Sequence, residues 1–172
     1  LRRSVPDICI MADASGVAGW GGHSSLGGFC QGNWSAAELR MHINRLELRA
    51  GHQAVARLAV PGQHIELKLD SSTAVAYINK MGGTRSSRLN TDALELWHAV
   101  LERGCWIRAV WTPRDANQLS DLLSKTRLAV WEFSLQTRVA ERIWREFFRP
   151  TVDLFASRES HLLPVYYSLR PD

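Results

Sequence analysis

The sequence has few cysteines and no long apolar run. Its three cysteines, Cys9, Cys30 and Cys105, are odd in number and none has C-x-x-C spacing, which favours buried, reduced thiols. The six histidines lack the spacing of a zinc site. No apolar run approaches the length of a membrane span, and no signal peptide is visible. We therefore expect an intracellular protein, cytoplasmic or nuclear, that is not secreted and has no membrane partner.

Lysine is also scarce. Lysines occur only at positions 68, 80 and 125, so almost all of the 21 basic residues are arginines. Arginine suits bidentate contacts with phosphate, although a GC-rich genome gives the same excess. The net charge of +4 is compatible with a polyanionic partner. With 172 residues, 45% of them apolar, the chain is long enough for one well-packed domain and a little more.

Hydrophobic patterns predict that the chain opens with three antiparallel strands. Residues 7–13 are an apolar run typical of a buried strand. Residues 17–23 and 28–34 predict two more strands, and the stretch 24–28, rich in Gly and Ser, predicts the hairpin between them.

From residue 44 onward, helices alternate with strands. Apolar residues repeat with a helical period over 44–59. The other predicted elements are a strand at 64–70, helices at 71–80 and 90–103, a strand at 105–111 and a helix at 116–125. This order predicts a three-layer α/β fold. Its five-stranded mixed sheet would have three antiparallel strands followed by two parallel ones, with helices on both faces.

Four carboxylates stand where such a fold can bring them to one site. Asp13 and Asp70 end two predicted strands, and a right-handed crossover places these strand ends side by side. Glu47 lies in the first predicted helix and Asp121 in the last. Neighbouring buried carboxylates repel each other unless a cation lies between them. Carboxylates that converge on a pair of divalent ions are used in metal-assisted phosphodiester chemistry.

Short motifs around these carboxylates follow one another along residues 7–125. They are Asp13-Ala-Ser15, Asn44-Arg-Leu-Glu-Leu48, Leu69-Asp70-Ser71 and Asn117-Gln-Leu-Ser-Asp-Leu-Leu-Ser-Lys125. In this order they resemble the motifs of the ribonuclease H family. Three further segments, Gly32-Asn-Trp-Ser35, His42-Ile-Asn-Arg-Leu-Glu-Leu48 and Thr151-Val-Asp-Leu-Phe-Ala-Ser157, resemble the DIRS group of tyrosine-recombinase retrotransposons. In that group the domain follows the reverse transcriptase in one polyprotein.

The resemblance implies a ribonuclease H-like fold and an endonuclease that hydrolyses the RNA strand of RNA–DNA hybrids during reverse transcription. It implies two Mg²⁺ ions, for which Mn²⁺ can substitute. Asp13, Glu47, Asp70 and Asp121 would be the catalytic metal ligands. The implied partners are the hybrid and the reverse transcriptase domain of the same polyprotein, of which this chain would be a piece.

The resemblance also suggests substrate contacts. Ser15, Gly16 and Asn44 are candidates to read the 2′-hydroxyl, the group that distinguishes RNA from DNA. Arg85 and Arg88 lie in a predicted loop at 81–89 and either hold a phosphate of the DNA strand or belong to a solvated turn. The family's separate basic helix is missing here.

One family feature is replaced by an aromatic residue. Many members carry a loop His before the last Asp, and Trp111 stands at that position, which predicts slower turnover. Most other tryptophans lie on apolar faces and are expected in the core, with Trp20 and Trp34 as candidates for base stacking.

The last part of the chain differs from the rest. We predict a catalytic domain at 1–125 and a C-terminal extension at 126–172, with an amphipathic basic helix at 134–148 and an irregular tail. Its arginine stripe, Arg138, Arg142, Arg145 and Arg149, is either a solvated helix face or a surface for the hybrid. No chemistry is assigned to Asp153.

Two other functions compete with hydrolysis of a hybrid. A DDE-type transposase or integrase would have a related fold, but the motif at Glu47 and the position of Asp121 argue against it. A non-catalytic ribonuclease H-like module would only bind nucleic acid or the reverse transcriptase. Such modules usually lose carboxylates, and all four are present here.

Overall fold

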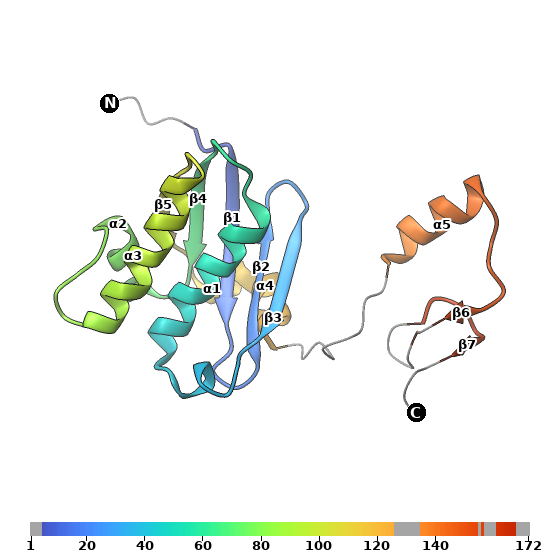
Figure 1. The fold of residues 1–172 in the computed structure, drawn as a ribbon, viewed down its shortest axis with the longest axis horizontal. Coiled ribbons are helices and arrows are strands. Elements are labelled where there is room, and N and C mark those ends of the chain that lie inside the picture. Colours follow the sequence, from blue (N-terminus) through green and yellow to red (C-terminus); the bar gives the residue numbers. More distant parts are fainter. Residues whose placement is uncertain (1–4, 126–134, 155, 157–160, 168–172) are drawn as a thin grey trace. The chain divides into compact units, whose positions relative to one another are not determined.

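The computed structural model describes residues 5–125, 135–154, 156 and 161–167. The chain divides into two compact units, residues 1–127 and 128–172, which are described separately (Figure 1). Among the described residues, no helix is long and apolar enough to cross a membrane.

The first unit is built on a five-stranded mixed sheet with the strand order β3-β2-β1-β4-β5 (Figure 1). The strands are β1 (Ile8–Ala14), β2 (Gly19–Ser24), β3 (Phe29–Asn33), β4 (His64–Leu69) and β5 (Trp106–Trp111). β1 pairs antiparallel with β2, and β2 with β3. β4 pairs in parallel with both β1 and β5. The predicted sheet, three antiparallel strands followed by two parallel ones, is confirmed.

The register of the parallel pair explains how two distant aspartates become neighbours. Ile8 of β1 lies opposite Ile65 of β4, and Met11 lies opposite Lys68. Continuing this register by two residues places Asp13 level with Asp70. Both strands therefore deliver a carboxylate to the same edge of the sheet, at their C-terminal ends.

Helices follow the strands much as the sequence pattern predicts. They are α1 (Ile43–Leu58), α2 (Ser72–Asn79), α3 (Ser87–Glu102) and α4 (Gln118–Lys125), with short 3-10 turns η1 (Glu38–Arg40) and η2 (Arg114–Asn117). α3 begins before the predicted Asn90, because the Ser86 hydroxyl accepts a hydrogen bond from the Leu89 amide at 3.3 Å and caps the helix. Arg88 consequently lies in the first turn of α3 and not in a loop.

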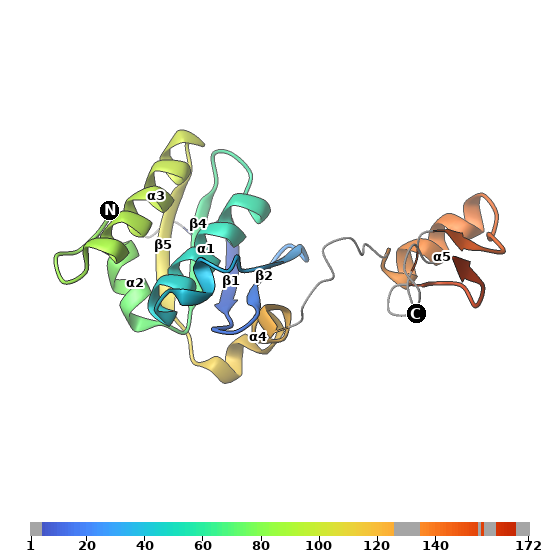
Figure 2. The same ribbon diagram turned by 60° about the horizontal axis from the view of Figure 1, so that its bottom comes forward.

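Two adjacent glycines of β2 show that α1 and α4 cover opposite faces of the sheet. A Cβ on Gly21 would lie 2.3 Å from the Leu123 Cβ of α4, and one on Gly22 would lie 2.7 Å from the Ala54 Cβ of α1. Successive residues of a strand point to opposite faces. In Figure 1, α1 and α3 lie in front of the sheet and α4 behind it, and Figure 2 gives a second view of this arrangement.

The core fills the space between the sheet and the helices. Its largest fully buried side chains include Ile8, Ile10, Leu46, Leu67 and Leu96. Trp20 and Trp34 also belong to this core, so they are not the exposed stacking platforms that the sequence allowed. The exposed tryptophans of the first unit are instead Trp106 and Trp111.

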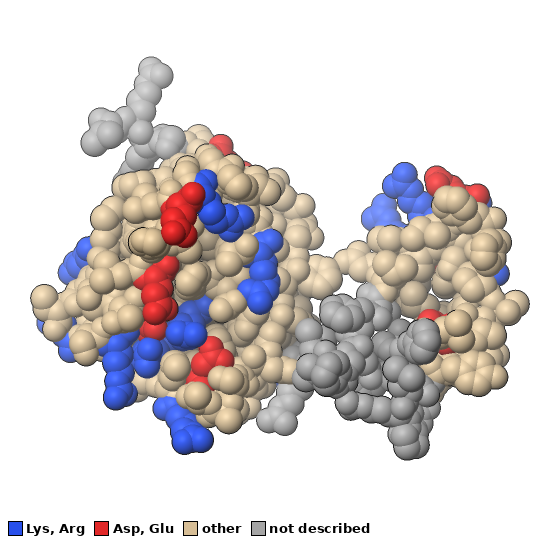
Figure 3. Space-filling model, viewed as in Figure 1, with Lys and Arg blue, Asp and Glu red and all other residues tan. Residues whose placement is uncertain are grey.

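The second unit contains α5 (Thr137–Glu146) and a small parallel pair, β6 (Asp153–Leu154) and β7 (Tyr166–Tyr167). Lys and Arg side chains gather over α5 in Figure 3. Among the described residues of the predicted tail, Asp153 makes two hydrogen bonds to the segment 162–165. The Asp153 amide donates to the Val165 carbonyl at 2.9 Å, and its carboxylate accepts from the Leu162 amide at 2.8 Å. The predicted tail residues 157–160 and 168–172 lie outside the described residues.

Candidate metal centre

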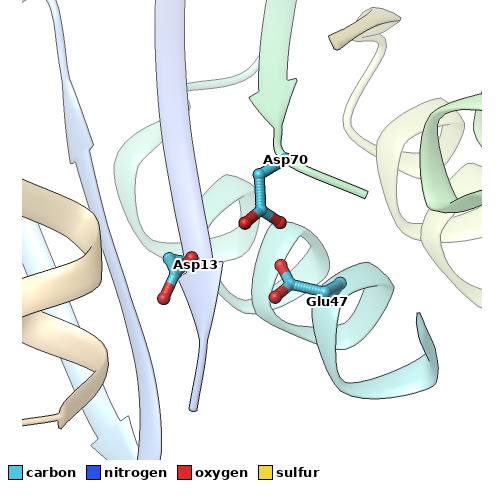
Figure 4. A group of neighbouring side chains, drawn as sticks. All are labelled: Asp13, Glu47 and Asp70. Carbon is cyan, nitrogen blue, oxygen red and sulfur yellow. The ribbon is translucent and has the colours of Figure 1, made fainter. Parts of the chain in front are cut away.

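Three carboxylates converge at the edge of the sheet where β1 and β4 end (Figure 4). Asp13 is near the end of β1, Asp70 directly follows β4, and Glu47 reaches them from α1. One oxygen from each lies within 4.8 Å of the others. Residues separated by more than twenty positions in sequence thus form one negatively charged group.

Burial makes this group costly without a cation. Asp13 is 1% exposed and Glu47 is 5% exposed. Within the described part of the chain, Oδ1 of Asp13 and Oε2 of Glu47 are buried without a hydrogen-bond partner. Burial raises the pKa of Asp13. Burial, together with the charges of Asp13 and Asp70, raises the pKa of Glu47 to about 9.

These residues fit a divalent cation. Hard cations such as Mg²⁺ prefer carboxylate oxygens, and only oxygen donors are offered here. The two unpartnered oxygens are the kind of buried acceptor that a protein normally satisfies. A bound cation would satisfy them and cancel the mutual repulsion that raises the pKa of Glu47.

α4 braces the centre from the opposite face of the sheet. The Ser124 hydroxyl lies 2.7 Å from Oδ2 of Asp13, and the buried Asn117 donates from Nδ2 to the Ala12 carbonyl at 2.9 Å. Asn117 lies in η2, directly before α4, so its hydrogen bond ties the start of that helix to β1. Ser124 was not singled out from the sequence. Its position one helical turn after Asp121 was the available signal, because that spacing puts both on one helix face.

The fourth predicted ligand, Asp121, has two positively charged side chains as neighbours. Among the described residues, the converging group does not include it. Arg114 donates from Nε to its Oδ1 at 3.0 Å, and Nη2 of the same side chain forms an ion pair with that oxygen at 2.9 Å. Lys125 donates to its Oδ2 at 2.6 Å. The hydrogen bond from Lys125, followed by that from Arg114, lowers the pKa of Asp121. The structure therefore brings three of the four carboxylates together and pairs the fourth with two basic side chains.

The predicted readers of the 2′-hydroxyl lie beside the centre. Ser15 and Gly16 follow β1, and Gly16 is exposed. The Ser15 hydroxyl accepts from the Val17 amide at 3.3 Å, and its carbonyl accepts from Trp34 at 3.0 Å. Asn44 is half-buried in the first turn of α1, one turn before Glu47.

The two predicted phosphate-binding arginines line different hollows. Arg85 lines a cavity of about 930 Å³ between α2 and the start of α3, together with Lys80. Arg88 lines a second hollow of about 570 Å³, together with Arg40 and Arg45. Both arginines are exposed.

Trp111 stands next to Asp70. It is the last residue of β5 and is 54% exposed. Its indole Nε1 donates to the Asp70 carbonyl at 3.0 Å, and the next amide, of Thr112, donates to the Leu69 carbonyl at 2.9 Å. Trp111, the residue expected at the position where many ribonuclease H family members carry a His, therefore holds the backbone of a proposed metal ligand.

No protein-family model and no curated protein matches the chain. Solved structures do match it. Ribonuclease H1 of the archaeon Halobacterium salinarum is 20% identical with a TM-score of 0.52, over 67% of this chain and 92% of the other. LC11-RNase H1, solved with an RNA/DNA hybrid, is 19% identical with a TM-score of 0.55, over 68% and 93%.

The N-terminal ribonuclease H domain of a Mycobacterium tuberculosis protein is 18% identical with a TM-score of 0.52, over 67% of this chain and 88% of the other. All of these identities are low, so what the chain shares with these structures is the fold. That fold is the ribonuclease H fold, with the mixed sheet and flanking helices described above.

Proposed function

We propose that this chain is a metal-dependent ribonuclease H that hydrolyses the RNA strand of RNA–DNA hybrids. One observation carries the proposal: Asp13, Glu47 and Asp70 converge within 4.8 Å at the edge of a ribonuclease H fold. The solved complex of a structural neighbour with an RNA/DNA hybrid supports the choice of substrate class.

The free-energy cost of burying these carboxylates supports a catalytic function over nucleic-acid binding alone. A buried polar group without a partner costs free energy, and a buried charge costs more. Two of the carboxylate oxygens here are buried and unpartnered. A module that only binds nucleic acid would gain stability by replacing them. Retaining them is explained by a cation whose presence is required for function.

The proposed ligands are Asp13, Glu47 and Asp70, with Asp121 reaching a second ion. Two Mg²⁺ ions, or Mn²⁺ in their place, would supply charge stabilisation for both the attacking and the leaving oxygen of an in-line displacement at phosphorus. The products would carry 3′-hydroxyl and 5′-phosphate ends.

The chain's own residues select and orient the substrate. We assign recognition of the 2′-hydroxyl to Ser15, Gly16 and Asn44, which lie beside the carboxylates. Arg85 and Arg88 would hold phosphates of the DNA strand in their two hollows, because a guanidinium matches phosphate geometry.

The wider setting is also part of the proposal. The motifs at 32–35, 42–48 and 151–157 favour a DIRS-type retrotransposon polyprotein, in which the reverse transcriptase domain would be the partner. A DDE-type enzyme is disfavoured because Glu47 comes from the first helix and joins the two strand-end aspartates, and because Asp121 lies on the last helix of the first unit.

Cleavage of a labelled RNA–DNA hybrid in Mg²⁺ tests the proposal. We expect cleavage of the RNA strand only, no cleavage in EDTA, and loss of activity in Asp70→Asn. Because that change is isosteric, thermal unfolding should show that the variant is folded. A native chain without metal-dependent cleavage, or an Asp70→Asn variant with full activity, would refute the proposed function.

A further inference from the structure

The helix of the second unit, α5, exposes an apolar stripe. Val139, Ile143 and Phe147 recur at every fourth position, so they lie along one side of the helix and its C-cap. Their exposed fractions are 43%, 42% and 76%. On the neighbouring side, Ala140 is buried and Trp144 is half-buried. The helix therefore has one buried side and, next to it, an apolar side in solvent.

Four arginines border the other edge of this apolar stripe. Arg138, Arg142, Arg145 and Arg149 follow one another at intervals of three or four residues, and all four are exposed. Arg142 comes three residues after Val139, which makes the two side chains neighbours on the helix surface. Figure 3 shows basic side chains gathered over α5. Around the helix, an arginine stripe, an apolar stripe and a buried side thus follow one another.

This surface is costly while nothing covers it. Like charges three or four residues apart destabilise a helix. Among the described residues, none of the four arginines forms an ion pair. Arg145 donates to a backbone carbonyl and Arg149 faces the Trp144 ring, so no carboxylate offsets their charge. The apolar stripe beside them leaves apolar area in water. A partner that is both acidic and apolar would remove both costs.

A second copy of the chain does not match this charge pattern. Two α5 helices that met through their apolar stripes in an antiparallel pair would place both arginine stripes along the same edge, where they repel each other. In a parallel pair, each arginine stripe would meet the side of the other helix that carries Ala140, and that side is already buried. The pattern therefore points to a different molecule.

Glu146 argues against an anionic bilayer as that molecule. It is the last residue of α5 and lies between the two stripes, four residues after Arg142 and three after Ile143. An anionic surface would repel its carboxylate, and burying the charge among acyl chains would be costly. A nucleic acid would pair with the arginines but leave the apolar stripe in water. A protein can cover the apolar stripe and place a basic side chain opposite Glu146.

We propose that α5 is a docking surface for an acidic amphipathic helix of another protein. The apolar side of that helix covers Val139, Ile143 and Phe147, and its carboxylates pair with the arginine stripe. Apolar contacts then supply most of the affinity, while the ion pairs select an acidic partner over a basic one. The interaction does not depend on the proposed hydrolysis, because the metal centre lies in the first unit.

Two designed peptides test this surface on the full chain. Both are fluorescently labelled helices of about 20 residues, or about 30 Å, with a stripe of leucines along one side. One peptide has glutamates along both edges of the leucine stripe, and the other has lysines there. Fluorescence anisotropy gives the two affinities at several salt concentrations. We expect the glutamate peptide to bind on the order of tenfold more tightly, and salt to reduce this preference by screening the charges.

Variants assign the binding to α5. Ile143→Ser should weaken binding of the glutamate peptide on the order of tenfold, because an apolar side chain is lost from the interface. Leu94→Ser, the matched control, changes a similarly exposed residue of α3 and should bind as the wild type does. Arg138→Glu combined with Arg142→Glu should transfer the preference to the lysine peptide. Unfolding of α5 cannot produce such a reversal.

The opposite results would overturn the inference. They are equal affinity for the two peptides, binding of neither, or the same loss in Leu94→Ser as in Ile143→Ser. Vesicles of phosphatidylcholine and phosphatidylserine are the lipid probe, and tighter binding to them that is lost in Ile143→Ser would make α5 a membrane contact. Sedimentation velocity reports self-association, and a dimer lost in Ile143→Ser would make this surface a contact between copies. Cleavage of a hybrid should stay at the wild-type rate in Ile143→Ser, so the proposed function is tested separately.

Discussion

The Ser124 hydroxyl donates a hydrogen bond to Oδ2 of Asp13 at 2.7 Å, which links α4 to the end of β1 across the sheet. A hydrogen bond to an ionised acceptor is shorter and stronger than one between neutral groups. It fixes the rotation of the carboxylate and leaves Oδ1 as the oxygen without a partner. Ser124 would thereby select which oxygen of Asp13 faces a bound cation.

Replacing Ser124 by alanine should raise the pKa of Asp13 and lower the stability of the folded protein. The hydrogen bond lowers the pKa of Asp13 against the effect of burial, so its loss raises that pKa further. We expect the acidic limb of the pH–rate profile to move to higher pH in Ser124→Ala. An unpaired buried acceptor also costs about 1–3 kcal/mol of stability. Initial rates and chemical denaturation measure the two effects.

Ser120→Ala is the matched control for this change. Ser120 is an equally buried serine of α4, but its hydroxyl pairs with Nδ1 of His23 at 2.9 Å and not with a carboxylate. It should lose stability without moving the acidic limb. Equal displacement of the profile in both variants would assign the effect to general loosening of α4.

Glu47 makes the stability of the metal-free protein depend on pH. Its pKa is about 9 in the folded chain against an ordinary value of 4.5. Between these values the folded state binds more protons than the unfolded state, so stability falls as pH rises. Thermal unfolding in EDTA should therefore give a Tm that decreases from about pH 5 to about pH 9. Glu47→Gln, which stays neutral, should lose most of this decrease.

Adding Mg²⁺ should counteract the fall of Tm with rising pH in the native chain but not in Glu47→Gln. A metal binds the deprotonated carboxylate and stabilises the folded state by mass action. The rise in Tm on adding Mg²⁺ should grow with pH and reach several degrees, as about 1–2 kcal/mol would give in a chain of this size. An equal rise in Glu47→Gln would place the cation elsewhere.

Strand ends and helical periodicity were sufficient to predict the sheet and the meeting of Asp13 with Asp70 at one edge. The reason is that a parallel crossover leaves little freedom in where two strand ends meet. Glu47 and Asp121 were added by the motifs that resemble ribonuclease H, and among the described residues only Glu47 joins the converging group. Contacts that depend on side-chain conformation could not be predicted from these patterns. The pairing of Arg114 with Asp121, the hydrogen bond from Trp111 and the burial of Trp20 all depend on packing between segments that no local pattern specifies.

If the lack of a loop histidine slows the enzyme, a histidine introduced beside the metal centre should raise turnover. The resemblance to ribonuclease H places this histidine at Trp111, but the Trp111 indole donates a hydrogen bond to the Asp70 carbonyl. Within the 111–115 segment, Asp115 is exposed and offers a position that leaves that contact and the Arg114 pair intact. We expect general acid–base assistance to raise kcat in Asp115→His by on the order of 10²-fold, the lower end of its usual range.

The contrasting variant is Trp111→His, which adds the ring but removes the hydrogen bond to Asp70. It should gain less than Asp115→His, or lose activity, and its Mg²⁺ affinity by calorimetry should fall. Unchanged or lower turnover in Asp115→His would show that the missing histidine does not limit the rate.

In hybrid binding, the arginine stripe of α5 should behave as a solvated helix face. Two of its members already contact residues of α5. Arg145 donates to the Glu141 carbonyl at 3.3 Å. The guanidinium of Arg149, which lies beyond the end of α5, is 5.3 Å from the Trp144 ring centroid. We expect the double variant Arg138→Gln, Arg142→Gln to leave the salt dependence of hybrid binding unchanged. If both arginines contacted phosphates, the slope would fall by about two. That fall in slope would assign α5 to the surface that binds the hybrid.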